Sequence, residues 1–226
     1  MNKPSMLAAI EAVLDTERAL RRAADTVDDL SNVAASALRV LDDAAVDAFY
    51  AHGEERRNLY LRSAGEHLER IRNRSGVMND LGADLTRHLT TASNAIEQAS
   101  YELGRSTDEN DRGSELQALW TQIDVLGEVV ALARPVADQI TRHAQHAAES
   151  AGATDALMLL DSRVHDTGKE MNRADVGVSV MRSVIEHAQV RAHTSSALAG
   201  SLSYAASHPP QPATETQQPG QSGIAI

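Results

Sequence analysis

Apolar residues recur along most of this 226-residue chain at alternating steps of three and four positions. An α-helix has about 3.6 residues per turn, so this spacing collects them on one side of a helix, and an apolar side requires a partner surface. The clearest stripe consists of Leu61, Ala64, Leu68, Ile71, Ser75, Met78, Gly82, Leu85, Leu89, Ala92, Ile96, Ala99 and Leu103. Stripes of this kind predict four long helices. Their expected ranges are residues 5–52, 54–104, 114–151 and 154–204.

The first helix has a wider apolar side than the others. Its stripe consists of Met6, Ile10, Val13, Glu17, Leu20, Ala24, Val27, Ser31, Ala34, Leu38, Leu41, Ala45 and Ala48. A second line widens the later turns and consists of Leu30, Val33, Ala37, Val40 and Ala44. A wide apolar side fits a multi-helix bundle better than a two-stranded coil.

Glycine-containing breaks separate the last two helices from the rest and from each other. Residues 104–113 are polar with a glycine at each end, and residues 152–155 offer a turn glycine and an N-cap. The third stripe is Leu116, Leu119, Ile123, Leu126, Val130, Ala133, Ala137, Ile140, Ala144, Ala147 and Ala151. The fourth is Leu157, Leu160, Val164, Thr167, Met171, Ala174, Val178, Met181, Ile185, Ala188, Ala192, Ser195, Ala199 and Leu202. Pro135 predicts a kink in the third helix, because proline lacks the N–H group and its ring clashes with the preceding turn.

The connection near Gly53 admits two interpretations. The heptad phase changes around residues 51–54, and Gly53 can supply the left-handed conformation that often ends a helix. These features favour a tight turn. The alternative is one helix of about 100 residues with a shift in its coiled-coil phase, which would make the protein a long two-helix coiled-coil hairpin.

We therefore expect an all-α protein, an elongated antiparallel four-helix bundle with coiled-coil packing, built from residues 1–205. Residues 206–226 carry four prolines among Gln, Thr, Ser and Gly. Such a segment cannot bury enough apolar surface to offset its chain entropy, so we expect a disordered tail.

The composition and net charge of the chain limit the classes of partner that it is expected to bind. The net charge of −11 disfavours binding to nucleic acid and to anionic membranes. The chain has no run of 18 apolar residues and no Sec-type signal peptide, so we expect a cytoplasmic protein that spans no membrane, or alternatively one secreted without a Sec signal. Alanine is the commonest residue and arginine far outnumbers lysine, which is typical of high-GC bacterial genomes.

One histidine pair has the spacing of metal ligands. His143 and His146 lie one helical turn apart and Glu149 lies one turn further, so two nitrogens and a carboxylate could share a face. Solvated surface residues are the simpler interpretation. The chain also has no cysteine and lacks the Glu-x-x-His pairs of di-iron bundles. The sequence therefore predicts no metal site and no cofactor.

The chain carries no recognisable catalytic motif. It has no Gly-x-Ser-x-Gly and no Gly-rich phosphate loop, so we expect no catalytic residues and no small-molecule substrate. We interpret Glu17 as a carboxylate at the core edge that reaches solvent or pairs with arginine, and Trp120 as an anchor for the core or for one end of the bundle. Four polar residues at stripe positions are expected to bond to the preceding helical turn or, alternatively, to fix the register of the helices. These are Ser31, Ser75, Thr167 and Ser195.

Tyr50 and Glu54 form a Tyr-x-x-x-Glu pattern. This pattern resembles the export signal of type VII secretion substrates, which are helical hairpins from high-GC Gram-positive bacteria. The resemblance implies a secreted or secretion-associated helical protein. That family also carries Trp-x-Gly in its hairpin turn, whereas Trp120 is followed here by Thr121 and Gln122. Its tyrosine motif normally follows the hairpin, whereas Tyr50 ends the first predicted helix.

We expect a non-enzymatic structural or scaffolding protein that contacts protein partners, or copies of itself, through its helix faces. The first alternative is a substrate or partner of type VII secretion. The second is an enzyme with a site inside the bundle.

Overall fold

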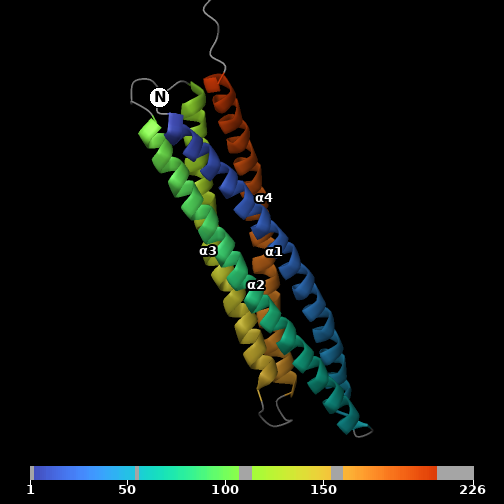
Figure 1. Cartoon of the computed structure of the whole chain (residues 1–226). Coiled ribbons are helices and arrows are strands. Elements are labelled where there is room, and N and C mark those ends of the chain that lie inside the picture. The colour runs from blue at the N-terminus through green and yellow to red at the C-terminus, as the bar shows by residue number, and fades with distance from the viewer. Residues whose placement is uncertain (1–2, 54–55, 107–113, 154–159, 208–226) are drawn as a thin grey trace, which may run out of the picture.

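The computed structural model describes residues 3–53, 56–106, 114–153 and 160–207, and in these residues it contains four long helices (Figure 1). They are α1 (Lys3–Tyr50), α2 (Arg57–Ser106), α3 (Ser114–Gly152) and α4 (Leu160–Ser207). The expected antiparallel four-helix bundle is therefore confirmed. The longest helix, α2, has 50 residues, which corresponds to about 75 Å at about 1.5 Å per residue.

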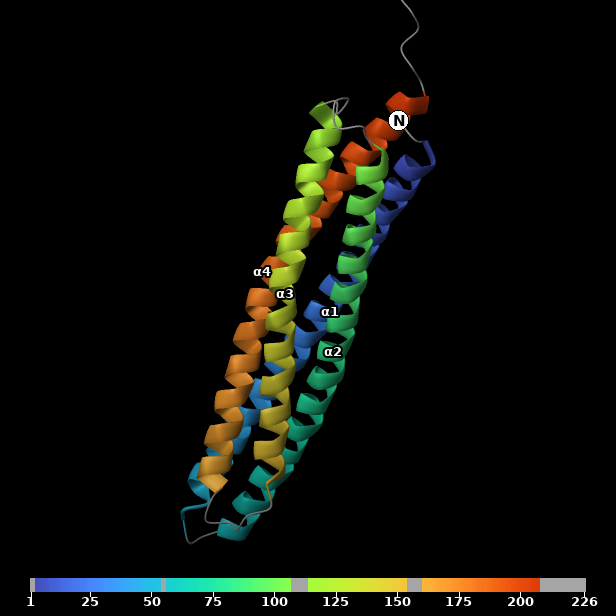
Figure 2. The same ribbon diagram turned by 90° about the vertical axis from the view of Figure 1, so that its left-hand side faces the viewer.

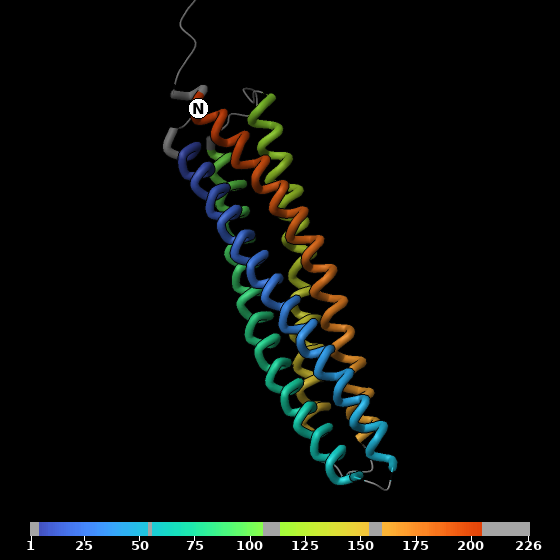
Figure 3. Tube along the Cα trace, turned by 90° about the vertical axis from the view of Figure 1, so that its right-hand side faces the viewer, coloured from blue at the N-terminus to red at the C-terminus, as the bar shows by residue number. Residues whose placement is uncertain are grey.

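Each helix packs against two neighbours. The pairs are α1 with α2, α2 with α3, α3 with α4, and α1 with α4, so α1 and α3 lie diagonally across the bundle, as do α2 and α4 (Figure 2). The N-terminus lies at the same end as the C-terminal end of α4, and the α1–α2 turn lies at the opposite end (Figure 3). We call these the N-terminal end and the turn end.

The predicted stripes of α2, α3 and α4 lie in the core, and among the described stripe residues of α4 only Leu202 is partly exposed. Every stripe residue of α3 is buried, and in α2 only Leu61 is partly exposed. By length and composition alone α3 is apolar enough to cross a membrane, but in the bundle its stripe faces the other helices. α3 continues unbroken through Pro135.

In α1 the structure buries only part of the predicted apolar side and also buries residues that neither predicted line contains. Every seventh position from Met6 to Ala48 is buried, as expected. Leu30, Ala37 and Ala44 of the predicted second line are also buried. Further buried residues that neither line contains include Ala9, Ala12, Thr16, Ala19, Ala23 and Thr26. Other residues of the first predicted stripe, such as Ile10, Glu17 and Ala45, are partly or fully exposed. The cause is the position of α2 and α4, which together select the part of the apolar side that is covered.

The chain turns after α1, so the alternative of one continuous helix over residues 5–104 is wrong. The last turn of α1 tightens, because the N–H groups of His52 and Gly53 donate to the carbonyls of Phe49 and Tyr50 at 3.3 and 3.2 Å. Gly53 does not take the left-handed conformation that we expected. Arg56 does, with φ of 60°, immediately before α2 begins.

Glycines permit close contact between helices in the middle of the bundle. A Cβ atom at Gly82 of α2 would collide with Oγ1 of Thr141 on α3. One at Gly177 of α4 would lie 2.8 Å from Cγ1 of Ile140 on α3. Both glycines therefore allow neighbouring helices to approach more closely than any other residue would.

The polar residues of the core behave in different ways. Ser195 donates to the Arg191 carbonyl at 3.0 Å, as expected. Ser75 contacts the Met171 sulfur across the bundle at 3.4 Å, and the Thr167 hydroxyl has no hydrogen-bond partner among the described residues, so the prediction of a bond to the preceding turn is wrong for these two. The predicted tail falls almost wholly outside the described residues, and α4 extends to Ser207.

Candidate functional site

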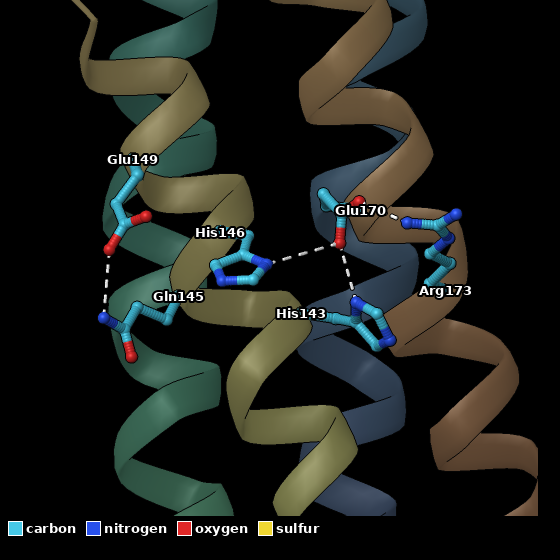
Figure 4. Close-up of polar contacts among 6 residues, drawn as sticks. All are labelled: His143, Gln145, His146, Glu149, Glu170 and Arg173. Carbon is cyan, nitrogen blue, oxygen red and sulfur yellow. Dashed lines mark hydrogen bonds and ion pairs between the residues drawn. The ribbon is translucent and has the colours of Figure 1, made fainter.

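The histidine pair predicted from the sequence lies on α3, but Glu149 is not its partner. The Glu149 carboxylate accepts a hydrogen bond from Gln145 Nε2 at 2.9 Å on another side of the helix (Figure 4). The third group is Glu170, which α4 presents to the histidines. Glu170 precedes the core residue Met171 by one position, so it lies at the edge of the face that α4 turns toward the core.

His143, His146 and Glu170 form a compact polar cluster between α3 and α4. Nδ1 of His143 lies 2.6 Å from Oε2 of Glu170, and Nδ1 of His146 lies 3.9 Å from the same oxygen. The second oxygen, Oε1, accepts a hydrogen bond from Arg173 at 2.6 Å. One carboxylate thus connects two imidazoles and a guanidinium.

The environment of Glu170 favours its ionised form. Burial by itself raises the pKa of this carboxyl, but the hydrogen bond from His143 and the charge of Arg173 outweigh burial and hold the pKa below its usual value. An ionised carboxylate only accepts hydrogen bonds, so Nδ1 of His143 carries the proton in this contact. The cluster therefore places one negatively charged carboxylate beside two imidazole rings.

A second candidate region lies at the turn end. Phe49 and Tyr50 end α1, and Tyr60 lies in the first turn of α2. Their rings are in contact, with centroids 5.5 Å apart for Phe49 and Tyr50 and also for Tyr50 and Tyr60. We call these three residues the turn-end patch. Phe49 is 73% exposed and Tyr50 54% exposed, so most of the two rings faces solvent.

A groove of about 570 Å³ lies beside the turn-end patch, between α1 and α4. Phe49 lines it together with Leu41 and Val164. At one side His52 and Asp161 connect the end of α1 to the start of α4, with Nε2 2.6 Å from Oδ2. The patch therefore continues into a partly apolar surface.

The N-terminal end carries the remaining aromatic residues, Tyr101, Trp120 and Tyr204. Trp120 packs against the core and lies beside Gly104 near the end of α2, where a Cβ atom would be 3.5 Å from its ring. This agrees with its predicted role as an anchor at one end. The guanidinium of Arg105 lies 5.6 Å from the centre of the Tyr101 ring.

Glu17 lies at the core edge, as interpreted from the sequence. Its Oε2 accepts a hydrogen bond from Ser196 of α4 at 2.8 Å, and its Oε1 lies 3.4 Å from Arg21. It thereby connects α1 to α4.

One residue of the Tyr-x-x-x-Glu pattern, Tyr50, lies at the turn end. Tyr50 is the last residue of α1 and belongs to the turn-end patch. Glu54 lies outside the described residues. Tyr50 thus ends the first helix of the bundle and does not follow a completed helical hairpin.

Compared with known protein families, curated proteins and solved structures, the chain matches none of them.

Proposed function

We propose that the protein is a non-enzymatic scaffold that acts through contacts at its ends. The observation that carries this proposal is the distribution of the aromatic residues. The chain has only six, and all of them lie in the first or last two turns of a helix. They are Phe49, Tyr50, Tyr60, Tyr101, Trp120 and Tyr204.

Aromatic residues are enriched at the centres of protein interfaces because they remove a large apolar area from water and lose little conformational entropy. In the turn-end patch, the rings of Phe49 and Tyr50 contribute little to the core, since most of their surface is exposed. Their mutual contacts give the patch a defined shape. These properties support a role in docking.

The partner that we propose for the turn-end patch is a second copy of this chain. Side-by-side association of two rods, each with a net charge of −11, would bring long acidic surfaces together. Contact at the tips keeps most of that charge apart. A symmetric contact also pairs each patch with itself, which is the commonest arrangement in homodimers.

Sedimentation velocity over a concentration series tests this proposal. Wild-type protein should pass from monomer to dimer as concentration rises, and the double variant Phe49→Ser, Tyr50→Ser should remain monomeric. Leu132→Ser is the matched control, because Leu132 is 67% exposed but lies in the middle of α3. Small-angle scattering should give the dimer a maximum dimension near 150 Å, about twice the length of one rod.

A wild-type protein that stays monomeric at every concentration would contradict the proposal. So would a dimer that Leu132→Ser weakens as strongly as the double variant does, because the contact would then lie along the side of the rod.

Recognition by a type VII secretion system is the second candidate. The exposure of Tyr50 favours it, because an export signal must be accessible to its receptor. In a bacterium with such a system, Tyr50→Ala should abolish export and Phe49→Ala should leave it intact. Equal export of both variants and the wild type would exclude a signal at this tyrosine.

A further inference from the structure

We propose that His143, His146 and Glu170 form a binding site for a divalent transition-metal ion, with Zn²⁺ as the best match. The three side chains each offer one ligand atom, and these atoms all lie within 4.8 Å of one another. They come from two helices, so a bound ion would link α3 to α4 (Figure 4).

The spacing of the ligand atoms is close to that of a tetrahedral site. Metal–ligand distances of about 2.0–2.1 Å put neighbouring ligand atoms about 3.3–3.4 Å apart in a tetrahedron. The distances to Oε2 of Glu170 are 2.6 Å from Nδ1 of His143 and 3.9 Å from Nδ1 of His146. One distance is shorter than required and the other is longer, and all three ligand atoms lie within 4.8 Å of one another, so binding requires rotation of these side chains.

The donor set selects the class of ion. Two imidazole nitrogens and one carboxylate oxygen suit Zn²⁺ and similar transition metals, whereas Ca²⁺ and Mg²⁺ prefer all-oxygen ligands. The ion would take the place of the proton on Nδ1 of His143, and that proton moves to Nε2 of the same ring, so the imidazole stays a neutral ligand.

Arg173 acts as a positioning residue in this arrangement. Its bond to Oε1 holds the Glu170 carboxylate in place and leaves Oε2 directed toward the histidines. Its positive charge also opposes the binding of a cation, which limits the affinity.

The side of the site next to His146 is exposed, which leaves room for a fourth ligand of the ion. The Glu170 side chain is 14% exposed and that of His143 25%, whereas that of His146 is 50% exposed. An ion can therefore enter from the side of His146 and keep a water molecule as its fourth ligand.

Isothermal titration calorimetry of the untagged protein with ZnCl₂ tests the site. We expect one ion per chain, a melting temperature that rises by several degrees with excess Zn²⁺, and reversal of that rise by a chelator. Substituting even an outer-shell partner of a metal ligand typically lowers affinity 10- to 100-fold, so Glu170→Gln and His143→Asn should each lower it by at least about 100-fold. Co²⁺ should give the visible absorption of a tetrahedral site.

Glu149→Gln is the matched control, because Glu149 neighbours the histidines in sequence but bonds to Gln145. Its affinity for Zn²⁺ should equal that of the wild type. Melting curves in chelator check that each variant is folded, and His146→Asn provides a second ligand variant at a more exposed position. Absence of saturable binding overturns the proposal. So does a loss of affinity in Glu149→Gln, or unchanged affinity in Glu170→Gln.

Discussion

The middle of the bundle and its two ends are built from different residues. In the middle, alanine and glycine separate the larger aliphatic side chains, and Gly82 and Gly177 allow neighbouring helices to approach closely. At the ends the chain has all six of its aromatic residues, with Phe49 and Tyr50 largely exposed. We therefore expect the stability of the fold to depend mainly on close packing in the middle, and we propose that partners bind at the ends.

The largest expected effect comes from creating a cavity in the middle. Ile140 is fully buried against Gly177, which has no side chain that could fill the space, so Ile140→Ala should cost about 2–5 kcal/mol in the free energy of unfolding. Phe49→Ala at the turn end should change it by no more than about 0.5 kcal/mol. Urea unfolding followed by circular dichroism measures both. If Ile140→Ala and Phe49→Ala lowered the free energy of unfolding by the same amount, the proposed difference between the middle and the ends would be wrong.

An intermediate effect is expected from adding a methyl group where two helices meet. Gly82→Ala brings Cβ against Thr141, so we expect a loss of about 1–3 kcal/mol from strain. Gly76→Ala is the matched control on the same helix, because a Cβ atom there meets nothing within 4 Å. It should stabilise the protein by about 0.5–1 kcal/mol, since alanine favours the helix. Thermal melts compare the two variants, and two changes of the same sign would refute close packing at Gly82.

The smallest expected effect concerns Glu170, which lies between the middle and the turn end. His143, His146 and Arg173 face this carboxylate, and its pKa is lowered in the folded protein. Its ionisation therefore stabilises the fold above the pKa of the unfolded chain, about 4.3, and this contribution disappears as the pH falls through the lower folded value.

The comparison of wild type with Glu170→Gln in chelator isolates this contribution. At about pH 7 the wild type should melt at the higher temperature, and the difference should vanish as the pH approaches about 2. A difference that is independent of pH would mean that the charge of Glu170 has no effect on folding.

The helices were more predictable than the faces that they bury. In α2 and α3 the apolar stripe is narrow, so only one rotation of each helix about its own axis turns the stripe toward the other helices. In α1 both flanks contain alanine, and the structure buries Ala23 and Ala44 while leaving Ala24 and Ala45 more exposed. Alanine is small enough to fit either position, so the sequence of a single helix cannot select between them.

The candidate metal ligands could likewise be predicted only in part from the sequence. His143 and His146 could be paired from the sequence because helical spacing brings residues three apart onto one face. Glu149 satisfied that spacing too, yet its side chain bonds to Gln145. Glu170 could not be found in this way, because its approach depends on how α4 packs against α3.

Heptad spacing indicated long helices, since a helical apolar stripe must be covered by other helices, but it left open whether residues 5–104 form one helix or two. The same spacing located the buried residues of α2, α3 and α4. The left-handed conformation of Arg56, in place of Gly53, was not found from the sequence. Which part of the apolar side of α1 is covered, and the approach of Glu170 to the two histidines, depend on contacts between segments distant in the chain, because local periodicity carries no information about the relative rotation of packed helices.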